Sequence, residues 1–445
     1  MPQRWIKSSL YALGDRISAL IFGFGSVFIL LRMLTQESFG EWALFITLTA
    51  FIEVARNGLI QNALIKYLAG HAPDEHATIT TASFVLNCLL TLVSIGFLLF
   101  AGGFLNQLWH TQQMQTLCQL YCFTTLALIP LSQYNFLQQA NSDFRAIFWT
   151  NFVRQGIFFA FVAYNLIIGF KVSLTYLAAC QIVAAVVASG VAYSFSPKMS
   201  IWSSSIEWKW VNTLFQFGKF VLGTNLAAMI YKSVDKFMLG ALLPTTAPVA
   251  IYDVAIRINN INEVPTLSLA AILFPENAKR AQTDGTNALK YLYEKSVGIM
   301  LALVLPGIIF INLFPKLVIL LLAGEQYLET ANLLRLTTLF GFFLPFAIQF
   351  GSVFDAMGKP HLNFAFVVVG TLLNTLLNFL FISRFGLNGA VYATLLTFVL
   401  TFIGNQVLLR KHLDISFINI LKYLKDFYPE AWQLVLHKIK PSTTP

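Results

Sequence analysis

Long apolar runs separated by short polar breaks recur along the whole chain. A helix that crosses the hydrocarbon core of a bilayer needs about 20 mostly apolar residues, and these runs reach that length. In lipid each backbone N–H and C=O must be bonded within the protein, so the runs are expected to be helices. A β-barrel would alternate apolar and polar residues, and runs such as Phe364–Leu377 do not alternate. The sequence therefore predicts an all-α polytopic membrane protein.

Composition excludes a soluble fold. Of 445 residues, 57% are hydrophobic and 11% are charged, whereas a soluble domain has about 25% charged residues. The formal charge of +9 does not indicate nucleic acid, because a nucleic-acid-binding protein carries its basic patch on a soluble domain. Most cations here fall at the ends of expected helices, so the predicted surroundings are membrane lipids.

Hydropathy predicts about twelve spans in two six-helix halves around a central cavity. They lie near residues 10–31, 43–65, 82–104, 116–138, 147–168, 173–194, 214–240, 249–274, 296–321, 333–355, 362–382 and 388–409. Lys and Arg are concentrated on the side of the N-terminus, which predicts that both termini are cytoplasmic.

The predicted parts are an N-terminal half at 1–196, a cytoplasmic segment at 197–210, a C-terminal half at 211–410 and a cytoplasmic tail at 411–445. A faint repeat relates the halves, since LGDRISALIFGFGS from Leu13 resembles LGTNLAAMIYKSVD from Leu222. Two similar halves with a site between them are typical of transporters.

Apolar residues recur at helical spacing from Ile415 to Tyr428, with lysines between them. This pattern predicts an amphipathic helix on the inner leaflet, ended by Pro429. A helix that binds a protein partner is the alternative.

Ionisable residues at membrane depth are costly and usually face a wet interior. A guanidinium group matches phosphate oxygens and stays charged, so Arg16, Arg56 and Arg257 are predicted to hold an anionic head group. Arg154 and Lys232 are secondary candidates for the same role.

Ion pairing for packing is the alternative reading of these charges. Glu53 with Arg56, and Lys232 with Asp235, stand three residues apart and can pair on one helix. Arg16, Arg154 and Arg257 show no evident acid one turn away. Asp253 lies near a span end, where snorkelling would explain it.

No phosphate-binding glycine-rich loop is present, so ATP hydrolysis is not expected. Glu53, Asp235 and Glu263 are candidates to carry a coupling H⁺ or Na⁺. No catalytic constellation can be assembled, which predicts a protein that is not an enzyme and has no cofactor.

Metal and disulfide chemistry are not predicted either. His71 and His76 flank two acids in an expected inner loop, which is more typical of a solvated loop than of a metal site. The cysteines are interpreted as small apolar core residues; they are Cys88, Cys118, Cys122 and Cys180.

Several motifs in fixed order resemble one family. The stretch from Ser233 carries Asp235-Lys236-Phe237, then Leu239-Gly240, then Ala250-Ile251-Tyr252. Further segments are LFPENAKRAQTDG from Leu273, AMGKPHLNFAFVVVGTLLNTLLNFLFISRFGLNGAVYATLL from Ala356, and LRMLTQESFGEWALF near the N-terminus. Together they resemble the polysaccharide, O-antigen-type flippases of the multidrug/oligosaccharidyl-lipid/polysaccharide exporter superfamily.

The resemblance implies transfer of an undecaprenyl-pyrophosphate-linked oligosaccharide from the inner to the outer leaflet of a bacterial cytoplasmic (inner) membrane, by alternating access. Lipopolysaccharide synthesis and other polysaccharide-assembly proteins are the implied context. Two alternatives stay open, a cation-coupled multidrug antiporter of the same superfamily and a membrane glycan polymerase or ligase. The antiporter would be expected to have an acidic cavity, and the polymerase or ligase a long outer loop.

Overall fold

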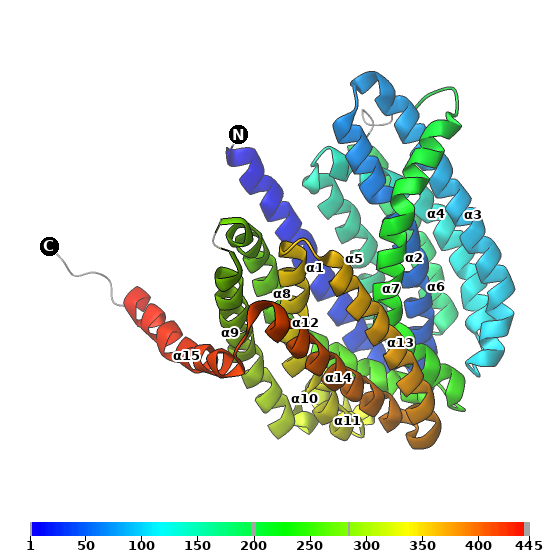
Figure 1. The fold of residues 1–445 in the computed structure, drawn as a ribbon. Helices are drawn as coiled ribbons and strands as arrows, with labels where there is room; N and C mark the ends of the chain where they lie inside the picture. The colour runs from blue at the N-terminus through cyan, green and yellow to red at the C-terminus, as the bar shows by residue number, and fades with distance from the viewer. Residues whose placement is uncertain (1, 197–201, 284, 440–445) are drawn as a thin grey trace. The chain divides into compact units, whose positions relative to one another are not determined.

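The computed structural model describes residues 2–196, 202–283 and 285–439 (Figure 1). Every regular element in these ranges is a helix, which confirms the all-α prediction. The chain divides into two compact units, Met1–Ala250 and Ile251–Pro445.

Unit 1 contains seven long helices. They are α1 (Pro2–Met33), α2 (Gln36–Gly70), α3 (His76–Leu108), α4 (Met114–Ala140), α5 (Phe144–Ile168), α6 (Leu174–Phe195) and α7 (Trp208–Leu242), with a short 3-10 turn, η1 (Pro73–Glu75). The helix α8 (Ala247–Thr283) begins in this unit and continues into the next. The helix after the predicted inter-half segment therefore packs with the first six.

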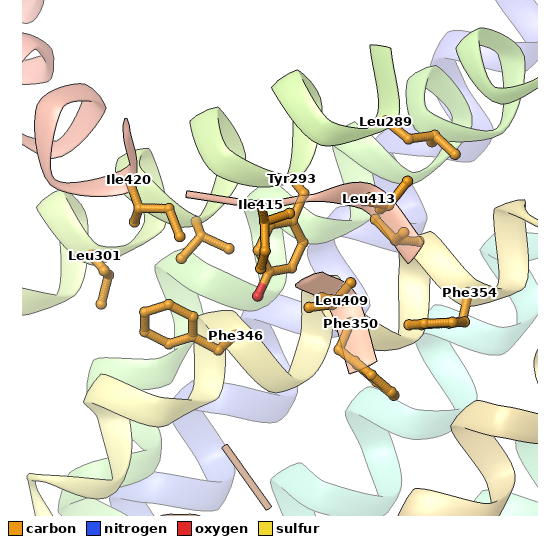
Figure 2. Packing of buried hydrophobic residues seen from close by; sticks show 12 residues of the cluster. Leu289, Tyr293, Leu301, Phe346, Phe350, Phe354, Leu409, Leu413, Ile415 and Ile420 are labelled. Carbon is orange, nitrogen blue, oxygen red and sulfur yellow. The ribbon is translucent and has the colours of Figure 1, made fainter. Parts of the chain in front are cut away.

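Unit 2 contains the rest of α8 and the remaining elements. These are α9 (Gly285–Leu313), α10 (Pro315–Leu322), η2 (Glu325–Tyr327), α11 (Thr330–Thr337), α12 (Phe340–Ala356), α13 (Pro360–Phe385), α14 (Leu387–Leu413) and α15 (Phe417–Ile439). Its core is an aromatic and aliphatic cluster in which Tyr293 of α9 meets Phe346 and Phe350 of α12 and Leu409 of α14 (Figure 2).

Ten described segments are long and apolar enough to span a membrane. They are Leu10–Met33, Gln36–Gly70, Pro73–Leu108, Met114–Ala140, Phe144–Ile168, Leu174–Phe195, Asn287–Leu313, Thr330–Ala356, His361–Phe385 and Leu387–Leu413. The other two predicted spans lie in α7 and α8, which are 35 and 37 residues long. These two helices carry much of the charge predicted at membrane depth, including Lys232 and Arg257. The chain is a multi-pass membrane protein.

The outer surface of these helices is strongly apolar. Phe100 and Ile167 are 89% and 84% exposed, and many other large apolar side chains are exposed with them. Apolar surface on this scale marks a membrane or protein contact rather than a face in water. The exposed residues therefore belong against lipid tails.

A glycine seam brings the backbones of α2 and α7 into contact. A Cβ placed at Gly218 would lie 1.8 Å from the carbonyl oxygen of Leu59, and one at Gly58 would lie 2.8 Å from Asn225 Nδ2. Close approach of this kind is a common way for membrane helices to associate, because lipid supplies no hydrophobic force between them. The seam joins α7 to the centre of unit 1.

The predicted tail helix exists, but its predicted end at Pro429 is wrong. The helix α15 runs from Phe417 to Ile439 with Pro429 inside it. A proline removes one backbone donor but keeps helical φ, and Tyr428, next to it, donates a hydrogen bond of 2.9 Å to Ala302 O on α9. Contact with α9 holds the turn before Pro429 in place, so the helix passes through the proline with the loss of one backbone hydrogen bond.

Candidate functional site

A cavity of about 230 Å³ lies inside unit 1. Its lining comes from three helices: Glu53, Arg56, Asn57 and Gln61 of α2; Leu128, Leu131, Ser132, Asn135, Phe136 and Gln139 of α4; Ile147, Asn151 and Arg154 of α5. Two cations and one acid are among them, so the lining has a formal charge of +1 (+2 − 1).

Helical periodicity explains why these residues face one space. On α2 the lining positions are 53, 56, 57 and 61, and on α5 they are 147, 151 and 154. Residues three and four apart share a face of a helix, so each set forms a polar stripe on an otherwise apolar helix. The set on α4 follows the same spacing and adds amides and a hydroxyl next to apolar side chains.

An ion pair joins two of these helices. Arg154 donates a hydrogen bond of 2.7 Å to Glu53 Oε1. The hydroxyl of Tyr121 on α4 donates to the same oxygen at 3.2 Å. Glu53 is therefore held by side chains of two neighbouring helices, and not by an exclusive pair with Arg56 on its own helix.

Arg56 is in a different situation. Its side chain is 4% exposed, and its Nε and Nη1 atoms have no hydrogen-bond partner within the described part of the chain. Burying an unsatisfied polar group costs free energy, and more for a charged one. A guanidinium kept in this state next to a cavity is suited to binding an anion there.

Neutral hydrogen-bonding groups complete the cavity. Gln61 donates to the side-chain oxygen of Gln139, and Asn151 donates to Asp15 Oδ1 of α1 at 3.0 Å. The Oδ1 atom of Asn135 is buried and lacks a partner among the residues described. The site thus offers both free donors and a free acceptor.

The structure brings together three of the eight predicted site residues, Glu53, Arg56 and Arg154. Arg16 is exposed on α1 and Lys232 is exposed on α7. Asp235, also on α7, is buried and has an interaction partner. None of these last three lines the cavity.

The expectation that no acid stands one turn from Arg257 is wrong, whereas Arg154 pairs with an acid that is not on its own helix. Arg154 finds Glu53 on another helix, and Arg257 pairs with Asp253, four residues earlier on α8. Asp253 is completely buried, so snorkelling does not explain it. The acid-to-arginine spacing of four residues was visible in the sequence and places both groups on one helix face. Glu263, in the same unit, accepts a hydrogen bond of 3.3 Å from Asn259.

The polar residues around the charges were not predicted. Tyr121, Asn135 and Gln139 occur at i, i+14 and i+18 on α4, five turns at 3.6 residues per turn from first to last. Amides repeated on one face of an apolar helix are the signal that identifies them. The same signal applies to Asn57 and Gln61 on α2.

The histidines and cysteines considered in the sequence do not line the cavity. His71 lies 4.0 Å from Glu75 in the loop, and no group of three metal-ligating side chains occurs among the described residues. All four cysteines are free thiols.

Comparison with solved structures identifies the fold. An inward-facing multidrug resistance MATE family transporter of the MOP superfamily matches with a TM-score of 0.74 at 16% identity, over 90% of this chain and 96% of the other. The lipid II flippase MurJ in an inward closed conformation matches with a TM-score of 0.71 at 13% identity, over 97% and 94%. At these identities the likeness concerns the fold.

Curated relatives are archaeal membrane proteins. An uncharacterized membrane protein of Methanocaldococcus jannaschii is 22% identical over 81% of this chain and 75% of its own length. A probable low-salt glycan biosynthesis flippase of Haloferax volcanii is 24% identical over 48% of this chain and 44% of its own.

A family profile described as "Polysaccharide biosynthesis protein" matches residues 29–332. The match covers the glycine seam and every residue that lines the cavity. This chain is a member of the polysaccharide biosynthesis protein family.

Proposed function

We propose that this protein is a flippase that moves an oligosaccharide, linked to a phosphorylated polyprenyl lipid, across the membrane by alternating access. The observation that carries the proposal is the buried guanidinium of Arg56, whose Nε and Nη1 have no partner in the described chain and which lines a cavity of net positive charge. Planar guanidinium donors match phosphate oxygens. Family membership and the flippase relatives support the same reading.

Undecaprenyl pyrophosphate is the proposed carrier, and transfer from the inner to the outer leaflet is the proposed direction. The cavity lies toward the C-terminal ends of α2 and α4 and the N-terminal end of α5. The Lys and Arg distribution assigns these ends to the cytoplasmic side. The phosphate site is then on the side from which a lipid-linked glycan is taken up in the proposed bacterial inner membrane.

The ion pair between Glu53 and Arg154 is the proposed site at which ion movement is coupled to lipid transport. Protonation of Glu53 would remove its charge and leave the guanidinium of Arg154 available to a phosphate. Arg16, Arg257 and Lys232 are further candidates to bind the anionic head group, and Asp235 and Glu263 are further candidates for the coupling ion. Collapse of the H⁺ and Na⁺ gradients is expected to stop net accumulation if this coupling operates.

A multidrug antiporter is the alternative, and the charge of the cavity argues against it. A cationic drug prefers an acidic site, whereas a formal charge of +1 repels it. A glycan polymerase or ligase has no support from the relatives compared above, because those with named activities are transporters and flippases.

Proteoliposomes test the proposal. The probe is undecaprenyl-pyrophosphate-linked chitobiose with a fluorescent label on the terminal sugar, and dithionite quenches the label only in the outer leaflet. In liposomes that contain the wild-type protein, nearly all of the label should become accessible to dithionite. In empty liposomes, the label of the inner leaflet should stay protected. Arg56→Ala should abolish this exposure, while Arg145→Ala, an exposed arginine on α5, should not. Transport of ethidium without movement of the lipid would support the antiporter instead.

A further inference from the structure

The cavity contains a free acceptor that a phosphate cannot satisfy. Asn135 Oδ1 is buried without a hydrogen-bond partner among described residues, as are Nε and Nη1 of Arg56. A phosphate at neutral pH mostly accepts hydrogen bonds, so it can bind Arg56 but cannot satisfy an amide oxygen, which needs a donor. A ligand that carries an O–H or N–H group close to its phosphate would satisfy both Arg56 and Asn135.

The walls near Asn135 fit a sugar ring. Asn57 follows Arg56 on α2, and Ser132 lies three residues before Asn135 on α4. Leu131 and Phe136 line the same cavity and are buried at 2% and 3% exposure. A pyranose presents hydroxyl groups around its edge and C–H groups on its faces, which matches a wall of neutral polar groups next to apolar ones.

The size of the cavity limits how much of the ligand enters. At about 230 Å³ it is smaller than the roughly 300–1,000 Å³ of pockets that enclose a drug-sized ligand. It suits one sugar together with its phosphate. The remaining sugars of an oligosaccharide would stay outside this cavity.

We propose that Asn135 determines specificity as part of a sugar subsite, in which its side-chain oxygen accepts a hydrogen bond from the sugar nearest the phosphate held by Arg56. This inference rests on the proposed function and refines it, because it assigns recognition to the first sugar of the glycan. The protein would then accept glycans that differ beyond that sugar.

Binding of short-chain soluble analogues tests the subsite. The probes are farnesyl pyrophosphate and its conjugates with glucose, galactose and N-acetylglucosamine, titrated into the detergent-purified full-length chain. The wild-type protein should bind at least one conjugate about two- to tenfold more tightly than farnesyl pyrophosphate, the range that one neutral hydrogen bond supplies. Asn135→Leu should remove that preference, so that the variant binds each conjugate no more tightly than it binds farnesyl pyrophosphate.

Gln119→Leu is the matched control, since Gln119 is an exposed amide on the same helix, and it should keep the preference. Asn135→Ala repeats the test if Asn135→Leu does not fold, as judged by thermal unfolding. The subsite is refuted if no sugar tightens binding to the wild type, or if the preference survives both changes at Asn135. Absence of any farnesyl pyrophosphate binding that depends on Arg56 would instead refute the proposed function, and the subsite with it.

Discussion

Glu53 Oε1 lies 2.7 Å from Arg154 Nη2, so that an acid of α2 and a base of α5 neutralise each other across two helices. The side chains are 28% and 33% exposed, because they border the cavity. Arg56, one turn from Glu53, is the cation in this group whose buried donors lack a hydrogen bond within the described chain. The pair thus sets which guanidinium is available to a ligand.

Loss of one partner from this pair should destabilise the protein. Glu53→Gln leaves Arg154 without its counter-charge, and we expect a loss of about 1–3 kcal/mol, less than the 3–5 kcal/mol of a fully buried pair. Thermal unfolding in detergent measures it. In Glu53→Gln/Arg154→Gln the loss should be smaller than the sum of the single losses. Additive losses would show that the two side chains do not interact.

We expect Arg56 to lower the thermal stability of the protein, relative to an apolar side chain of similar length, while it supports transport. Arg56→Met keeps a long side chain and removes a buried charge with unsatisfied donors, so the melting temperature should stay unchanged or rise. Lipid flipping should fall to the level of empty liposomes. A variant that loses transport only because it unfolds at lower temperature would contradict a binding role for Arg56.

The glycine seam predicts a sharp difference between two glycines of α7. At Gly218 an added Cβ would lie 1.8 Å from a backbone oxygen of α2, whereas at Gly223 no atom lies within 4 Å. Gly218→Ala should therefore cost about 1–3 kcal/mol or more through overpacking. Gly223→Ala should be neutral or stabilise by up to about 1 kcal/mol, from helix propensity. Thermal unfolding of the two variants, side by side, measures the difference, and equal melting temperatures would contradict the close packing of α2 and α7.

Glu294 should anchor the tail helix. Its carboxylate accepts hydrogen bonds from the backbone N–H of Ser416 at 2.7 Å and from Asn419 Nδ2 at 2.9 Å. Glu294→Ala removes both, and we expect the docking of α15 on α9 to weaken by about 1–3 kcal/mol. Hydrogen exchange of the α15 amides should become faster, and the amides of α2 serve as the internal control. Unchanged exchange in α15 would show that apolar packing alone holds the helix.

The fold was largely predictable, because each membrane helix is specified by the apolar residues of its own segment. Runs of about 20 apolar residues must bond their own backbone in lipid, and the helices α1 to α6 lie where hydropathy places them. The local pattern gave a wrong end at Pro429, because proline can keep the helical φ and the turn before it is held on α9 by the hydrogen bond from Tyr428 to Ala302.

The site was predictable as a list of charges but not as an arrangement. Spacing of three residues allowed a pair between Glu53 and Arg56, and the structure gives Glu53 a partner one hundred and one residues away. Tertiary packing determines which helices lie side by side. The spacing of charges along one helix does not predict that packing. Asn135 was missed because the search followed charges, and the neutral amides repeated along one face of α4 carry none.

The close approach of Gly218 to Leu59 ties α7 to α2, so the seventh helix belongs to the first unit although it follows the expected inter-half segment. A gene fragment meant to yield that unit should accordingly extend through Ala250 rather than stop after the sixth helix.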